Sequence, residues 1–97
     1  MGMNNEAEGR VGFRVVGRVQ GVGFRWWTRR TAMELGLHGW VRNERDGSVV
    51  VHAGGSSEAL ARFEDALRRG PTASRVDRLE SIAPAGSIEP GEFRIDT

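Results

Sequence analysis

The pattern of apolar residues in this 97-residue chain predicts one α+β domain whose elements follow the order β-α-β-β-α-β. Two observations lead to this prediction. Apolar residues alternate with polar or small ones in several short segments, and they recur at helical spacing in two longer segments. Glycine-containing turns separate most of these segments. The order is that of the ferredoxin-like, or split βαβ, arrangement, an antiparallel sheet with two helices on one face.

The first part of the chain predicts a strand, a glycine-rich loop and a helix. Alternating apolar residues indicate a strand over residues 11–16. Residues 24–35 carry apolar side chains at helical spacing, and Gly36 is a natural end for this helix. The loop at residues 17–23 therefore leads from the end of a strand into the start of a helix.

The middle of the chain predicts a hairpin. Residues 37–43 and 48–53 are rich in residues that favour strands. The pair Asp46-Gly47 between them favours a tight reversal. We therefore expect two antiparallel neighbours joined by a short turn.

The last third predicts a helix followed by two strands. Ser56 or Ser57 offers an N-cap, and Gly70, followed by proline, ends the helix. Its core-facing residues are Leu60, Phe63 and Leu67. Residues 76–82 indicate a less regular strand, and residues 93–95 a short extra one. We expect a domain over residues 10–97, preceded by a flexible tail at residues 1–9.

Composition narrows the possible chemistry. The chain has no cysteine, lysine or tyrosine, which excludes disulfides, thiolate zinc sites, Schiff-base lysines and phenolic acids. Its two histidines fall on different predicted strands, so we expect no metal site and no cofactor. The 14 basic residues are balanced by 13 acidic ones, which gives little reason to expect a nucleic-acid partner. Without a long apolar run we expect no membrane association, and we predict a cytoplasmic protein.

The loop at residues 17–23 has the features of an anion site. Glycines allow successive backbone N–H groups to face one point, and the helix that follows adds partial positive charge there. Arg25, in the first helical turn, brings a planar set of donors that matches two phosphate oxygens. A P-loop needs a lysine and a dinucleotide fingerprint needs a third glycine at position 26, so both are excluded. The simpler alternative is a tight turn beside a surface arginine.

Asn43 is a candidate because it ends a predicted strand expected to lie near the first strand and its loop. Its carboxamide donates and accepts hydrogen bonds, so it can orient a water molecule beside a bound phosphate. A role in the turn alone is the alternative. Thr28 lies close enough in sequence to support the site, and Trp26 or Trp27 is a candidate wall.

Residues 17–25 and 39–49 resemble the two signature motifs of the acylphosphatases, and the similarity extends from about residue 11 to residue 95. The resemblance implies hydrolysis of the carboxyl–phosphate bond of acyl phosphates to carboxylate and inorganic phosphate, without a cofactor. By position, Arg25 would bind phosphate and Asn43 would orient the attacking water. The residues that match the family's phosphate-binding loop are Arg18, Val19, Gln20, Gly21, Val22 and Gly23.

The chain departs from the family pattern at two positions. Gly23 stands where many members carry a larger side chain, and Val50 stands where an acidic residue is common. We expect a monomer whose partner is a small acyl phosphate. One alternative is a non-catalytic acylphosphatase-like module that binds acyl or carbamoyl phosphate for a larger protein. A second, an RNA-binding domain of the same topology, is disfavoured because few aromatic residues fall on the predicted strands.

Overall fold

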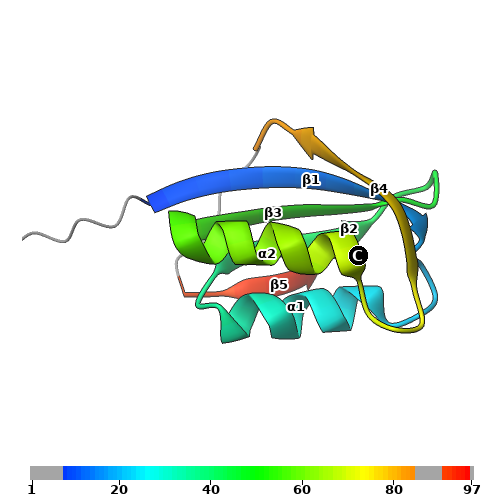
Figure 1. The fold of residues 1–97 in the computed structure, drawn as a ribbon, viewed down its shortest axis with the longest axis horizontal. Helices are drawn as coiled ribbons and strands as arrows, with labels where there is room; N and C mark the ends of the chain where they lie inside the picture. Colours follow the sequence, from blue (N-terminus) through cyan, green and yellow to red (C-terminus); the bar gives the residue numbers. More distant parts are fainter. Residues whose placement is uncertain (1–7, 85–90, 97) are drawn as a thin grey trace, which may run out of the picture.

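A computed structural model describes residues 8–84 and 91–96 and shows a layer of two helices on a five-stranded sheet (Figure 1). The elements, in chain order, are β1 (Glu8–Arg18), α1 (Phe24–Glu34), β2 (His38–Asn43), β3 (Val49–Ser56), α2 (Ser57–Arg69), β4 (Arg75–Ile82) and β5 (Phe93–Asp96). The predicted β-α-β-β-α-β order is confirmed, and the extra short terminal strand is present as β5.

The strands lie in the order β4-β1-β3-β2-β5. β1 pairs antiparallel with β3 and β4, and β2 pairs antiparallel with β3 in the predicted hairpin. The prediction of a wholly antiparallel sheet needs one correction, because β5 pairs in parallel with β2 and makes the sheet mixed. The reason is directional. Three antiparallel pairings separate β4 from β2, so these two strands run in opposite directions. β5, which follows β4 in the chain, also runs opposite to β4 and therefore runs in the same direction as β2.

Both helices lie on the same face of the sheet, and they contact each other (Figure 1). α1 packs on β2 and β5, whereas α2 packs on β1, β3 and β4. Between helices and sheet lies one apolar core, which includes Phe13, Val15, Phe24, Val41, Val51, Phe63, Leu67 and Phe93. Burial of this shared core is what fixes the two helices on the sheet.

β1 begins earlier than the sequence predicts. Glu8 and Gly9 pair with Ser56 and Gly55 of β3, so both belong to the sheet and not to a tail. The alternation of apolar residues starts only at position 11, which is why the pattern did not extend the strand to these positions. The rest of the predicted tail, residues 1–7, lies outside the described residues.

The two helices begin differently. Ser56 is the N-cap of α2, and its Oγ accepts a hydrogen bond from the Ala59 N–H at 3.2 Å. α1 follows Gly23, which has no side chain to cap the first turn. The first N–H groups of α1 have no acceptor within the helix and remain available to an external one.

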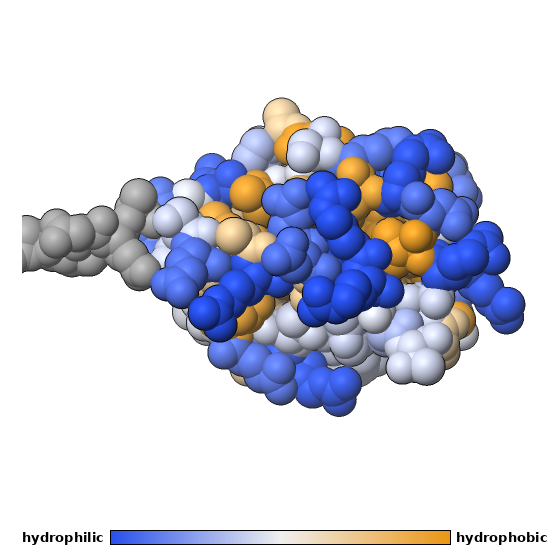
Figure 2. Space-filling view, in the orientation of Figure 1, coloured by the Kyte–Doolittle hydropathy of each residue, from blue (hydrophilic) through white to orange (hydrophobic). Residues whose placement is uncertain are grey.

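Figure 2 shows the helix-bearing face as mostly hydrophilic, with apolar surface in separate patches between charged side chains. Within the part of the chain that the structure describes, neither helix has the length and the apolar run needed to span a bilayer.

Candidate active site

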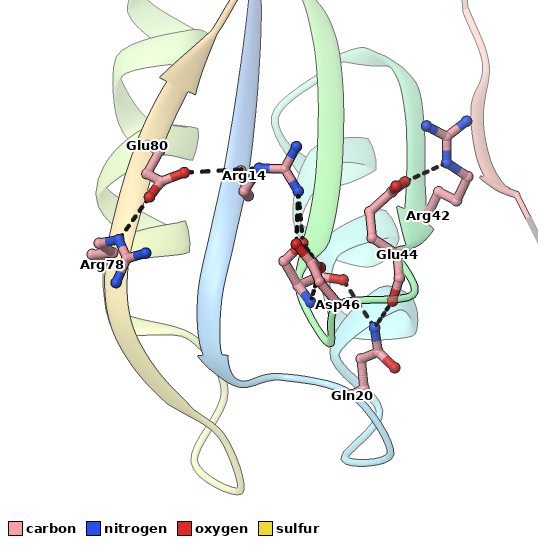
Figure 3. A network of polar contacts seen from close by, with 8 residues as sticks. Arg14, Gln20, Arg42, Glu44, Asp46, Arg78 and Glu80 are labelled. Atoms are coloured by element: carbon pink, nitrogen blue, oxygen red, sulfur yellow. Dashed lines mark hydrogen bonds and ion pairs between the residues drawn. The ribbon is translucent and has the colours of Figure 1, made fainter.

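The glycine-rich loop and the β2–β3 hairpin turn meet at one end of the molecule (Figure 1). Gln20 makes the connection, because its Nε2 donates to the main-chain oxygens of Glu44, at 2.7 Å, and Ser48, at 2.9 Å (Figure 3). Asn43 ends β2, and β3 lies between β2 and β1, so the strand of Asn43 is not paired directly with β1. The loop reaches the hairpin across the end of β3 through Gln20.

Two glycines give the loop its shape. Gly21 and Gly23 have φ values of 76° and 77°, in the left-handed region that other residues rarely adopt. A Cβ at either position would point into open space, so the requirement is conformational and not steric. Left-handed residues of this kind turn neighbouring N–H groups toward a common side, which is the geometry of an anion-binding loop.

Arg25 lies in the first turn of α1 and is partly buried. Its Nη1 donates to the main-chain oxygen of Asp96, the last residue of β5, at 3.2 Å. This bond uses one of the five N–H groups of the guanidinium and holds the side chain beside the loop. The remaining N–H groups are enough for bidentate binding of an oxyanion.

Asn43 is the last residue of β2, where it pairs with Val49 across the hairpin. Its Oδ1 is buried and finds no hydrogen-bond donor among residues 8–84 and 91–96. A buried acceptor without a partner costs about 1–3 kcal/mol. Such a cost points to a site where the missing donor belongs to a bound molecule.

These groups enclose one small cavity of about 140 Å³. Its lining residues come from the loop, the start of α1 and the end of β2: Val19, Gly21, Gly23, Phe24, Arg25, Trp26 and Asn43. Pockets for drug-sized ligands begin at about 300 Å³, so this one suits a small ion. We call it the anion cavity. Arg25 and Asn43, both chosen from the sequence, line it together.

The loop residues chosen from the sequence divide into two groups. Val19, Gly21 and Gly23 line the anion cavity. The others have different positions: the Arg18 side chain is exposed at the end of β1, the Gln20 side chain binds the hairpin, and Val22 packs against the core. Thr28 is buried, and its Oγ1 has no hydrogen-bond partner among the described residues, yet it does not line the cavity.

The hairpin turn that follows Asn43 is held by its own polar contacts (Figure 3). Oδ1 of Asp46 accepts hydrogen bonds from the Ser48 hydroxyl, at 2.6 Å, and from the Ser48 N–H, at 2.9 Å. These bonds lower the pKa of Asp46 below 3.8, with a smaller contribution from the positive charge of Arg14. Nη1 of Arg14 also donates to the Ser48 hydroxyl at 2.9 Å. These hydrogen bonds therefore hold the turn that directly follows Asn43 in one conformation.

Among the described residues, no three His, Asp or Glu side chains gather in a way that would hold a metal ion. His52 lies buried on β3 with its ring stacked on Trp40 at 4.3 Å between centroids. Burial lowers its pKa below 6.5, and the positive charges of Arg42 and Arg10 add to the effect. It is a structural residue of the sheet, as its place in the sequence suggested.

The sequence did not predict the contact of Arg25 with Asp96, and it left open whether Trp26 or Trp27 lines the site. The carbonyl of Asp96 that holds Arg25 left no trace in the sequence, because every residue has a main-chain oxygen. Trp26 and Trp27 were both candidate walls, although the helical spacing from Phe24 puts Trp27 on the apolar side of the helix. The structure places Trp26 at the cavity and packs Trp27 against the core.

Comparison with known proteins identifies the family of this chain. The family model described as Acylphosphatase matches residues 5–95. The chain belongs to the acylphosphatase family. An acylphosphatase of Nitratidesulfovibrio vulgaris (strain Hildenborough) is 63% identical over 70 residues, which cover 72% of this chain and 70% of the relative. An acylphosphatase of Mesorhizobium japonicum is 48% identical over 91 residues, which cover 94% and 97%.

Solved structures place the acylphosphatase fold in two settings. The acylphosphatase of Bacillus subtilis matches with a TM-score of 0.82 at 34% identity, covering 91% of this chain and 98% of that one. HypF of T. kodakarensis matches with a TM-score of 0.74 at 31% identity, covering 90% of this chain but 12% of that protein. The fold therefore occurs both alone and as a small part of a longer chain.

Proposed function

We propose that this chain hydrolyses acyl phosphates at the bond between phosphorus and the bridging oxygen, with Arg25 and the loop binding the phosphate and Asn43 orienting the water. The observation that carries the proposal is the shared cavity. Arg25, Asn43 and the two left-handed glycines, Gly21 and Gly23, line the same space of about 140 Å³, and Oδ1 of Asn43 is buried without a partner among the described residues. Relatives that are 46–63% identical bear the name acylphosphatase, which supports an enzymatic activity.

The phosphate would be held by charge and by aligned donors. The N–H groups at the start of α1 and in the loop lie at the positive end of the helix dipole. Arg25 adds a guanidinium that the main-chain oxygen of Asp96 helps to hold in place. Preorganised donors of this kind stabilise the charge that builds on the phosphoryl oxygens during transfer. The loop residues in this role are those from Arg18 to Gly23, through their main-chain N–H groups.

Asn43 would position the nucleophile. A water molecule that donates one hydrogen to Oδ1 has its lone pairs free to face the phosphorus. Because a carboxamide does not take up a proton at neutral pH, Asn43 orients the water and does not deprotonate it. Holding the water in line with the leaving carboxylate supplies the gain from proximity.

The reaction balances without a protein base. Water oxygen bonds to phosphorus, the bond from phosphorus to the bridging oxygen breaks, and its electron pair leaves on the carboxylate. One proton of the water passes to a phosphoryl oxygen, so an acyl phosphate dianion gives one carboxylate and one dihydrogen phosphate. The carboxylate is a good leaving group, so positioning and charge stabilisation suffice.

The test follows phosphate release from acetyl phosphate and benzoyl phosphate by the purified full chain. In water enriched in ¹⁸O the label should appear in phosphate; label in the carboxylate would contradict attack at phosphorus. Arg25→Ala should remove measurable turnover. Arg62→Ala, an exposed residue of α2, serves as the matched arginine control and should retain wild-type activity. A folded Arg25→Ala variant with wild-type activity would refute the assignment.

One other candidate is a module that binds acyl or carbamoyl phosphate without hydrolysing it, and we keep it because the chain also matches a small part of the longer HypF chain. The phosphate-release assay separates the two candidates, because such a module would release no phosphate. Binding of the ligand would still raise the melting temperature of the module.

The cysteine-free sequence fits a reducing compartment, so we place the activity in the cytoplasm. We infer a monomer that acts on a small substrate and not on nucleic acid, which size-exclusion chromatography and an RNA shift assay check.

A further inference from the structure

Trp26 is an exposed tryptophan at the rim of the anion cavity. It directly follows Arg25 in the first turn of α1, and it is 68% exposed. Tryptophan is highly buried on average, so exposure on this scale adds nothing to the core. It lines the anion cavity together with Arg25 and Asn43. A large aromatic surface therefore borders the place where the phosphate would bind.

The same side chain also lines a groove outside the cavity. Trp26, Arg29 and Ile95 border a shallow, open hollow of about 580 Å³ on the surface between α1 and β5. One wall is fixed, because Nε of Arg29 donates to the main-chain oxygen of Phe93 at 3.0 Å. The other wall is the apolar side chain of Ile95, which packs against the core. We call this the α1–β5 groove.

We propose that the α1–β5 groove binds the acyl group of the substrate and that Trp26 selects acyl phosphates with an aromatic acyl group. The inference rests on the proposed function. The anion cavity, at about 140 Å³, holds a phosphate but not a phosphate together with an aromatic ring. One bridging oxygen separates phosphorus from the acyl carbon, so the acyl group must leave the cavity at its rim, where Trp26 connects the two spaces.

The chemistry of the groove favours an aromatic guest. An indole ring attracts another aromatic ring in stacked or edge-to-face contact. The guanidinium of Arg29 is planar, a shape that can pack on the face of an aromatic guest, and Ile95 offers apolar contact. An acetyl group is too small to cover these surfaces. Because the ring makes the same contacts in the bound substrate and in the transition state, these contacts should act mainly on KM and only weakly on kcat.

The experiment compares kcat/KM for benzoyl phosphate and acetyl phosphate in four versions of the full chain. The wild type should prefer benzoyl phosphate. Trp26→Ala should lower the benzoyl-to-acetyl ratio about tenfold, mainly through KM for benzoyl phosphate, which is the size of one lost aromatic contact. Trp26→Phe should keep most of the preference. Arg62→Ala is the control, because Arg62 is exposed on α2 and lines neither the anion cavity nor the groove, and its ratio should equal that of the wild type.

Inhibition by inorganic phosphate separates this proposal from the function it rests on, since phosphate reports on the anion cavity alone. Because Trp26 also lines the rim of the anion cavity, the inhibition constant for phosphate can change in Trp26→Ala, and the groove assignment is supported if the benzoyl-to-acetyl ratio falls by more than that constant changes. An unchanged ratio in an active Trp26→Ala variant overturns it, and so does an equal loss on both substrates. A wild-type chain that releases phosphate from neither substrate fails at the proposed function instead, before the ratio is defined.

Discussion

Nη1 of Arg25 donates to the main-chain oxygen of Asp96 at 3.2 Å, across 71 positions of sequence. This bond joins the start of the first helix to the end of the last strand. It also determines how Arg25 can serve a phosphate, because a guanidinium can bind the carbonyl with one edge and present other N–H groups to the cavity. A lysine has a single charged nitrogen that cannot cover both directions.

The first prediction follows from that geometry. Arg25→Lys keeps the positive charge but loses the planar donor set, so kcat/KM for acetyl phosphate should fall on the order of 10²–10³. Inorganic phosphate should raise the melting temperature of the wild type, because it binds only the folded chain, and it should raise that of Arg25→Ala much less. Near-wild-type kinetics in Arg25→Lys would show that charge alone is enough and that bidentate binding is not used.

Asn43 should show opposite effects on activity and on stability. Asn43→Ala removes the group that would orient the water, so kcat should fall on the order of 10²–10³. It also removes a buried oxygen without a partner among the described residues, so the free energy of unfolding should stay unchanged or rise by up to about 1 kcal/mol. Kinetics with acetyl phosphate and urea denaturation measure the two effects. A large loss of stability would mean that Asn43 is a structural turn residue.

Gln20 should act by positioning the loop. Gln20→Ala loses two hydrogen bonds to the hairpin, so the free energy of unfolding should fall by about 2 kcal/mol. Because the loop then loses its link to the turn that presents Asn43, KM for acetyl phosphate should rise as well. Arg62→Ala, which breaks one exposed ion pair, is a control for stability and should change it by less than about 1 kcal/mol.

His52 should make stability depend on pH. Its pKa is lowered in the folded state, so the unfolded chain binds more protons and the free energy of unfolding rises with pH through this range. We expect stability to fall as pH drops from about 7.5 to about 5.5, and His52→Phe to flatten this slope. NMR titration of the ring measures the pKa directly, with His38→Gln assigning the signal. A His52 pKa at or above 6.5 would contradict the prediction.

The element order was predictable from sequence because each strand and helix carries its own apolar periodicity. Arg25 and Asn43 stood out for a similar local reason, since one follows a glycine loop and the other ends a strand before a turn. The direction of β5 was not predictable, because alternation in Phe93 and Ile95 does not say which edge a strand joins. Strand pairing depends on contacts between distant segments, which local patterns do not record.

The site likewise has features that the local sequence predicts and features that depend on contacts between distant segments. The positive φ of Gly21 and Gly23 fits the glycine pattern, so the loop could be anticipated. The role of Gln20 could not, because its acceptors are main-chain oxygens in a turn 24 and 28 positions away. The exposure of Trp26 fits the helical spacing, because Trp27 lies three positions after Phe24 on the apolar side of the helix. The place of Trp26 beside the cavity did not follow from that spacing.

β5 has four residues and occupies an edge of the sheet, where only β2 pairs with it. Short edge strands are among the first parts of a fold to fray, at a cost below that of global unfolding. Fraying of β5 would release the carbonyl that steadies the Arg25 guanidinium while the rest of the sheet stays intact. Activity would then be lost at lower denaturant concentrations than the helical circular dichroism signal. The edge strand β5 would be the least stable element that supports the site.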